Sequence, residues 1–208
     1  TDRSRGLGDV YKRQPVKAIT AYVYEQFRNN IPMDFAKREG IVFVGGFGHP
    51  PNADAVFWFA KEIYPLIRQK IQMPFYIVGS SVTPEIEKLE GNGIIVKGFV
   101  SEEELARLYD TCRLVVVPLR YGAGVKGKVV EALYYGTPMV TTSVGIEGIP
   151  DPERVVKVAD DAEDFANAVI RLYQDETVLA QTVKDYQKLV KQNFSLEAVW
   201  NIVKEDFE

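Results

Sequence analysis

The sequence has little of several features that would mark particular protein classes. Among its 208 residues, Cys112 is the only cysteine and His49 the only histidine. These counts exclude an intrachain disulfide framework and a metal site built from several Cys or His ligands. We therefore expect no metal and no cofactor. Cys112 precedes an apolar run and is predicted to be an inert, buried residue.

Long apolar runs and an excess of positive charge are also missing. No run approaches the roughly 18 apolar residues that span a bilayer, and no apolar signal core follows the basic N-terminal residues. We expect a cytoplasmic protein, with peripheral association at the inner face of the membrane as its only membrane contact. The formal net charge of -4 offers no general field for nucleic acid, so an anion must be bound by a local cluster.

Six short apolar runs alternate with longer amphipathic segments after Gly40. They read IVFVGG, FYIVGS, GIIVKGFV, RLVVVPL, PMVTTS and RVVKVA, and each is bounded by Gly or Pro. Such runs are typical of parallel strands that helices cover on both faces. We predict an α/β fold: a doubly wound, Rossmann-like, six-stranded parallel sheet, with C-terminal helices from about residue 161.

The residues before this domain divide into two parts. Residues 1–15 are basic and contain glycine but no apolar period, so we interpret them as a tail or a foreign sequence. Residues 16–39 are predicted to form a helical arm or linker, because apolar residues recur there at helical spacing. These residues are Val16, Ile19, Val23 and Phe27. The domain itself is predicted to span residues 40–208.

Local signals predict helix boundaries inside the domain. Asn52 precedes ADAVFWFAKEIY and can cap its first amides, while Pro65 should end or kink that helix. Ser101 and Glu104 form a capping-box pattern at the start of SEEELARLY.

The stretch PLRYGAGVKGKVVEA, at 118–132, satisfies two phosphate-binding patterns at once. Gly122, Gly124 and Gly127 give G-x-G-x-x-G, and Gly122 with Gly127 and Lys128 gives G-x-x-x-x-G-K. A P-loop needs Ser or Thr after that lysine to ligate magnesium, but Val129 stands there. The P-loop interpretation is therefore disfavoured.

The dinucleotide interpretation needs an acidic residue at the end of the following strand, to hold the ribose hydroxyls. That strand ends in Thr141 and Thr142. A nicotinamide-dependent oxidoreductase is therefore a weak alternative.

The same stretch nevertheless has the chemistry of an anion site. Its glycines let backbone amides approach a phosphate, and a helix that begins near Lys128 directs its positive end there. Arg120, Lys126 and Lys128 add three cations with no acid before Glu131. Glu131 follows in the first helical turn or so, where a carboxylate can accept two vicinal sugar hydroxyls. We predict a site for a diphosphate joined to a ribose.

Three blocks of this sequence resemble the C-terminal, donor-binding half of group 1 glycosyltransferases. They read FVGGFGHPPNADAVFWF, GFVSEEELARLY and VVVPLRYGAGVKGKVVEALYYGTPMVTTSVGIEGI. The resemblance covers roughly residues 40 to 205. It implies a GT-B fold and a retaining, metal-independent transfer from a nucleoside-diphosphate sugar, within polysaccharide or glycoconjugate synthesis. It also implies an N-terminal acceptor domain that this chain lacks, so the fragment alone is expected to be inactive.

The family's signature is a pair of glutamates separated by seven residues. The second falls on Glu131, which implies contact with the nucleotide ribose. The first falls on Ala123, so the carboxylate near the donor sugar is absent. The alternative is therefore a non-catalytic module that binds nucleotide sugar in a degenerate site.

The resemblance completes the set of predicted site residues. Arg120 and Lys128 are predicted to be catalytic, because cations stabilise the charge that grows on the departing diphosphate. Gly45 and Gly46 would bring backbone close to the donor phosphates, and Phe99 and Val100 would border the base. The predicted donor-binding residues are Gly45, Gly46, His49, Phe99, Val100, Gly122, Gly124, Val125, Lys126, Gly127, Glu131 and Glu147.

Overall fold

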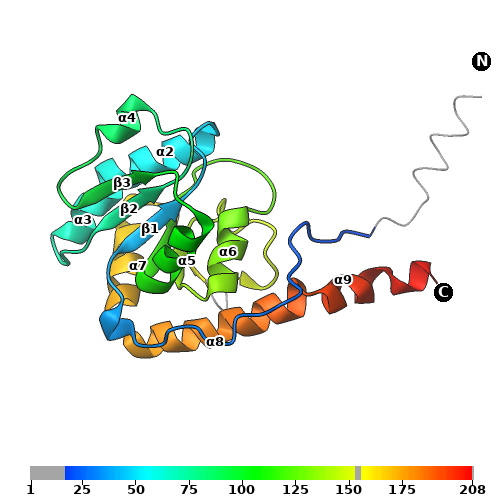
Figure 1. Cartoon of the computed structure of the whole chain (residues 1–208). Coiled ribbons are helices and arrows are strands. Elements are labelled where there is room, and N and C mark those ends of the chain that lie inside the picture. The colour runs from blue at the N-terminus through cyan, green and yellow to red at the C-terminus, as the bar shows by residue number, and fades with distance from the viewer. Residues whose placement is uncertain (1–16, 153–155, 208) are drawn as a thin grey trace, which may run out of the picture.

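A single parallel sheet forms the centre of the fold. The computed structural model describes residues 17–152 and 156–207, so the predicted tail lies outside the described residues. The strands are β1 (Ile41–Val44), β2 (Phe75–Val78), β3 (Ile94–Gly98), β4 (Leu114–Val117), β5 (Met139–Thr141) and β6 (Lys157–Val158). All pair in parallel, in the order β3-β2-β1-β4-β5-β6 (Figure 1). The predicted six-stranded, doubly wound sheet is confirmed.

The central strands explain why the apolar runs predicted the sheet correctly. β4 is buried along its whole length, and Ile41, Val42 and Phe43 of β1 are fully buried. Strands covered on both faces have no polar side to alternate with, so they are continuous apolar runs rich in β-branched residues. Ile41 pairs with Phe75 of β2 on one side and with Leu114 of β4 on the other.

Helices cover both faces of the sheet. Between β1 and β2 lie α2 (Pro50–Trp58), the π-helical turn η2 (Phe59–Ile63) and α3 (Tyr64–Arg68). The later crossovers carry α4 (Pro84–Glu87), α5 (Glu102–Thr111) and α6 (Gly127–Tyr135). The chain then continues through α7 (Ala162–Gln174), α8 (Glu176–Asn193) and α9 (Leu196–Val203), with short 3-10 turns η1 (Phe35–Lys37) and η4 (Lys204–Asp206). α7 packs against η2 and α3, whereas α8 packs against α6 (Figure 1).

The predicted boundaries of the first long helix need correction. His49, not Asn52, is the N-cap residue of α2, and the helix begins with Pro50. Proline suits a first helical position because it lacks only an amide that would be unpaired anyway. Pro65 does not end the helix either, since the π-helical turn precedes it and places it in the first turn of α3.

Other helix signals are confirmed. The Ser101 hydroxyl accepts the Glu104 amide at 3.2 Å and caps α5. α7, α8 and α9 each begin after a capping side chain that accepts an amide three residues on, at 2.9 to 3.0 Å. These caps are Asp161, Asp175 and Ser195.

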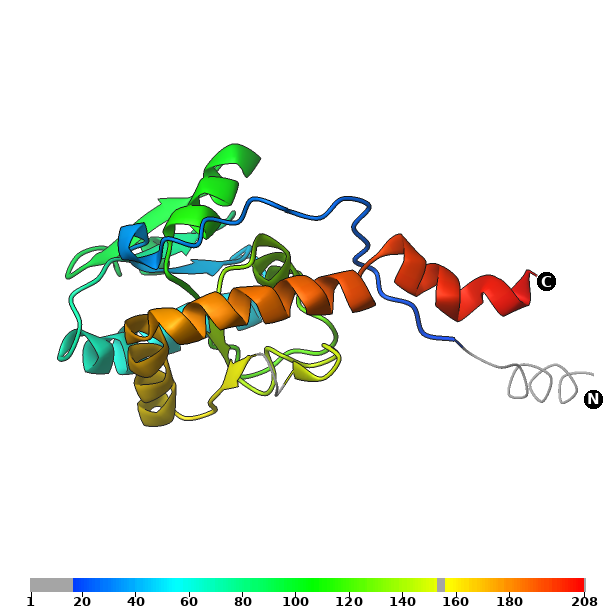
Figure 2. The ribbon, with the colours of Figure 1, turned by 90° about the horizontal axis from the view of Figure 1, so that it is seen from below.

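Residues 17–34 contain no helix, which corrects the helical half of the predicted helical arm or linker. The Tyr24 amide donates to the Phe194 carbonyl at 2.8 Å, and the Tyr24 ring stacks on Tyr134 of α6 at 4.0 Å. The arm therefore lies against the junction of α8 and α9 (Figure 2). Tertiary contacts of its aromatic residues, including Tyr22, decide its conformation in place of local spacing. Val16 lies outside the described residues.

The core contains aromatic residues of the first long helical segment and the only cysteine of the sequence. Trp58 and Phe59 are buried, and Phe165 of α7 contacts both of their rings edge-on. Cys112 is fully buried, and burial raises the pKa of its thiol to about 12. A thiol in that environment is inert at neutral pH.

Candidate functional site

The loops at the carboxyl ends of β1 and β4 surround a cavity of about 250 Å³. The strand order reverses between these two neighbouring strands, and ligands of doubly wound sheets bind at such a point. The lining residues come from the loop after β1, the start of α2, the loop after β4 and the start of α6. They are His49, Pro51, Asn52, Leu119, Tyr121, Gly122, Ala123, Val125, Lys126, Gly127 and Lys128.

The first turn of α6 lies beside this cavity, which Gly127 and Lys128 line. Lys126 is the N-cap residue, its side chain does not cap the helix, and the first turn holds no acidic residue. Gly122 (φ 128°) and Gly124 (φ 76°) take left-handed conformations in the loop before it, which favour glycine. Open amides at a helix start, without a competing carboxylate, suit an anion.

Lys128 lies beside this cavity in an unusual environment. Its Nζ donates to Asn52 Oδ1 and lies 4.4 Å from the centre of the Phe43 ring. The Asn52 amide nitrogen in turn donates to the Gly46 carbonyl at 2.7 Å. Burial lowers the pKa of Lys128 from 10.5 to about 7, although Glu131 opposes the shift. Lys128 therefore contacts the neutral groups Asn52 and Phe43 and gives up its proton more easily than an ordinary lysine.

Asn52 is a site residue that sequence reasoning missed. It was predicted to cap a helix, but its side chain joins the loop after β1 to Lys128. The two partners lie 76 residues apart in the chain, so no local pattern indicates the contact.

Gly45 lies against Lys128 and Asn52, and its approach to the donor phosphates stays a prediction. Its amide donates to the Val78 carbonyl at 2.9 Å within the sheet and so is engaged there. A Cβ atom at Gly45 would lie 2.6 Å from Lys128 Nζ and 2.9 Å from Asn52 Cγ. Glycine is required here because Lys128 and Asn52 occupy the space that a side chain would need.

Glu131 lies one helical turn after Lys128. Its Oε2 accepts a hydrogen bond from the Tyr109 hydroxyl at 3.0 Å. Burial raises the pKa of Glu131, while the Tyr109 hydrogen bond and Lys128 lower it. Lys128 and Glu131, the residues predicted to bind phosphate and ribose, therefore lie about one turn apart on α6, as their spacing in the sequence indicated.

The other two predicted cations are paired with acids. Arg120 makes a two-contact ion pair with Asp54 of α2, with Nε 2.9 Å from Oδ2. Lys126 Nζ lies 3.1 Å from Glu147 Oε2, which brings two predicted site residues together. A cluster without acids was predicted because only the stretch between Arg120 and Glu131 was considered. The structure supplies acids from other segments.

The remaining predicted residues divide between the cavity and the surface. His49, Gly122, Val125 and Gly127 line the cavity. Gly124 and Phe99 are exposed, with 81% of Phe99 accessible, and Val100 packs at the edge of the core. The part of the chain that the structure describes brings neither Phe99 nor Val100 into the cavity.

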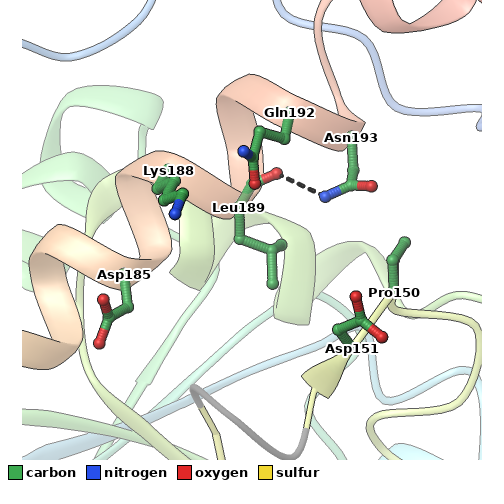
Figure 3. A pocket seen from close by; sticks show the side chains of 7 residues that line it. All are labelled: Pro150, Asp151, Asp185, Lys188, Leu189, Gln192 and Asn193. Carbon is green, nitrogen blue, oxygen red and sulfur yellow. Dashed lines mark hydrogen bonds between the residues drawn. The ribbon is translucent and has the colours of Figure 1, made fainter.

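A second hollow, of about 230 Å³, lies between α8 and the loop after β5 (Figure 3). Its lining is mostly polar and includes Asp151, Asp185 and Lys188. The Asn193 amide nitrogen donates to the Leu189 carbonyl at 3.0 Å at its rim. None of the predicted site residues lines this hollow.

Comparisons with known proteins agree with the fold. The family described as "Glycosyl transferases group 1" matches residues 38–175. A curated relative, an uncharacterised 44.6 kDa protein in the cps region of Klebsiella pneumoniae, is 27% identical over 173 residues. The match covers 78% of this chain and 44% of that protein, so the chain spans less than half of the relative's length.

Two solved structures have the same fold at low identity. Staphylococcus aureus TarM, in a complex that contains UDP, has a TM-score of 0.73 and 17% identity, covering 100% of this chain and 43% of TarM. Anabaena HepE in complex with UDP has a TM-score of 0.64 and 17% identity, covering 83% of this chain and 49% of HepE.

Because the family matches most of the chain, this protein belongs to the group 1 glycosyltransferases. Its Rossmann-like sheet is the C-terminal domain of the GT-B fold. Among the described residues, no helix is long and apolar enough to cross a membrane.

Proposed function

We propose that this chain is the donor-binding half of a glycosyltransferase and binds a nucleoside-diphosphate sugar at the start of α6. The carrying observation is that Lys128 and Glu131, a half-buried amine and a half-buried carboxylate, lie three residues apart on one helix. Lys128 and the open α6 amides would bind the diphosphate. Glu131 would accept the ribose hydroxyls.

The same groups suit the departure of the nucleoside diphosphate. Negative charge grows on the leaving oxygens in the transition state, and the half-buried Lys128 amine lies beside the cavity, where it can stabilise that charge. Lys126 and Arg120 could add charge only if they left Glu147 and Asp54. A lysine with helix amides can neutralise a diphosphate without a metal, so we propose metal-independent transfer that retains the anomeric configuration.

An N-terminal domain would bind the acceptor. The curated relative is more than twice as long as the matched region, which leaves room for such a domain. α9 has no buried residue, and Leu196 and Trp200 are 53% and 54% exposed. Apolar helix surface of this kind fits a contact that the fragment lacks. The relative's place in a cps region supports a role in polysaccharide synthesis.

Calorimetry of this chain with UDP, GDP, ADP, dTDP and NAD, with and without magnesium, tests the proposal. We expect one nucleoside diphosphate to bind equally well under both conditions. Lys128→Ala should weaken it by about thirtyfold, since a hydrogen bond from a charged group contributes ~1.5–3 kcal/mol. Glu131→Ala should weaken it by about tenfold on the same grounds.

Three results would contradict the proposal. If every diphosphate binds and neither Lys128→Ala nor Glu131→Ala changes its affinity, the nucleotide binds elsewhere. If NAD binds and Gly124→Val abolishes that binding, an oxidoreductase is favoured. Rapid sugar transfer by this fragment alone would show that no acceptor domain is needed.

A non-catalytic binding module remains the second candidate. Ala123 lines the cavity at the position where the family signature has its first glutamate. Full-length protein that binds the nucleotide sugar but neither transfers nor hydrolyses the sugar would favour this candidate.

A further inference from the structure

We infer that Tyr109 is a positioning residue for the nucleotide ribose, because its hydroxyl holds one oxygen of Glu131 and orients the carboxylate towards the sugar. The inference rests on the proposed function, since it assumes that Glu131 binds the ribose. Tyr109 itself touches no substrate.

The ring of Tyr109 is fixed on several sides. Tyr109 lies on α5 and is fully buried, and its ring stacks on Tyr135 at 4.6 Å with an angle of 10°. The Arg28 guanidinium covers the Tyr135 ring at 4.7 Å. The Thr137 hydroxyl donates to the Tyr109 carbonyl at 2.7 Å. These contacts fix the position of the Tyr109 hydroxyl, which donates a hydrogen bond to Glu131 Oε2 at 3.0 Å.

This contact limits what Glu131 can do. Among the described residues, Tyr109 is the only hydrogen-bond donor to its carboxylate. With Oε2 engaged on the α5 side, the free oxygen Oε1 and the remaining lone pairs must serve any ligand. A carboxylate held at one oxygen loses little rotational freedom when it accepts two vicinal hydroxyls, so the ribose is bound by a preorganised group.

The surroundings of Glu131 make that support necessary. Burial raises the pKa of Glu131 and so favours its neutral form, which accepts sugar hydroxyls less well. Tyr109 and Lys128 act in the opposite direction and favour the ionised form. Lys128 is engaged with Asn52, on the side of the cavity that we assign to the diphosphate.

Two ligands separate a positioning role from a structural one. UDP carries both ribose hydroxyls, and dideoxy-UDP lacks both. We expect Tyr109→Phe, which keeps the stacked ring, to weaken UDP by about fivefold, the scale of one hydrogen bond. Its affinity for dideoxy-UDP should change less than about twofold. If the calorimetry shows that the protein prefers another base, the nucleoside diphosphate of that base and its dideoxy analogue replace UDP and dideoxy-UDP.

Tyr186→Phe is the matched control. It also removes the hydroxyl of a fully buried tyrosine, one that accepts the Met139 amide at 3.1 Å near the start of β5. We expect it to leave the ratio of UDP to dideoxy-UDP affinities unchanged. If Tyr109→Phe does not fold, Tyr135→Leu removes the stacking surface while the Tyr109 hydroxyl remains, and it should lower the same ratio.

The outcomes are distinguishable. If Tyr109→Phe weakens the binding of UDP and of dideoxy-UDP equally, or weakens neither, the inference is overturned. The donor site still stands in that case if Glu131→Gln lowers the ratio of UDP to dideoxy-UDP affinity. A wild-type protein that does not discriminate between the ligands, or a ratio that Glu131→Gln leaves unchanged, overturns the ribose role of Glu131 and the inference with it. In the double variant with Glu131→Gln, Tyr109→Phe should have no further effect on the ratio.

Discussion

The loop at 119–126 and the first turn of α6 at 127–130 are neighbours in sequence, but they hold their charges differently. In the loop, Arg120 and Lys126 each pair with a carboxylate from another segment. In the helix turn, Lys128 is half-buried beside Phe43 and donates a hydrogen bond to the neutral side chain of Asn52. The loop's charge is therefore already neutralised, and the helix keeps a cation that an anion can still neutralise.

The difference shows that the number of basic residues does not measure the strength of an anion site. An exposed ion pair contributes little and must open before its cation can bind a ligand. A buried lysine without a carboxylate partner is destabilised in its charged form, so a bound diphosphate relieves an existing cost. We therefore expect perturbations of the helix turn to exceed those of the loop.

Gly45→Ala should have the largest effect of the three changes that test this contrast. The added Cβ would lie 2.6 Å from Lys128 Nζ and 2.9 Å from Asn52 Cγ, so both must move. We expect the free energy of unfolding to fall by about 1–3 kcal/mol, the usual cost of overpacking. Nucleotide affinity should fall by about tenfold, as one charged hydrogen bond is lost.

Gly48→Ala is the matched control, because a Cβ there would first meet Ser81 Oγ at 3.7 Å. Chemical denaturation and calorimetry on both variants make the comparison. Nucleotide affinity that survives Gly45→Ala would show that the position of Lys128 is not needed for binding.

A change of pH should have the next largest effect on nucleotide affinity. Lys128 has a pKa of about 7 in the free protein, and a bound diphosphate should keep it protonated. Affinity should therefore fall by about tenfold between about pH 6 and 8, because the protonated fraction of free Lys128 falls from about nine-tenths to about one-tenth. The dependence attributable to the protein should vanish in Lys128→Met, which also controls for titration of the nucleotide phosphate. Equal pH profiles for the two proteins would contradict the shifted lysine.

The same pKa predicts a sign for stability. The unfolded chain holds the Lys128 proton up to about its ordinary pKa of 10.5, and the folded protein loses it near pH 7. The unfolded state therefore binds more protons between these values, and the free energy of unfolding gains from this residue as pH rises. Denaturation of wild type and Lys128→Met should show the wild type gaining on the variant above about pH 7.

Most of the fold could be predicted from the sequence because its elements follow local rules. Strands buried on both faces are continuous apolar runs, and the C-terminal helices begin at capping residues such as Asp161 and Ser195. The arm at 17–34 does not follow its local pattern. Ile19, Val23 and Phe27 have helical spacing, but the arm forms no helix because its aromatic residues contact α6 and the end of α8, which are remote in sequence.

The candidate site could be predicted only in part, for the same reason. Gly127, Lys128 and Glu131 lie within about one turn of one another on α6, so their spacing placed them correctly. Their partners Asn52 and Tyr109 come from α2 and α5, 76 and 22 residues away from the groups that they hold. Only the folded topology brings such pairs together, and an unaligned sequence does not encode them in any local pattern.

Arg120→Ala should have the smallest effect and gives the sharpest test of the contrast. The side chain of Arg120 is 48% exposed and paired with Asp54, so its removal costs at most about 1 kcal/mol of stability. Because Asp54 already neutralises it, we expect nucleotide affinity to change less than about twofold. Asp54→Ala would free the guanidinium and should strengthen binding slightly. If Arg120→Ala instead weakens binding as much as Lys128→Ala does, the ion pair opens when the ligand binds, and the loop and the helix turn form one cationic site.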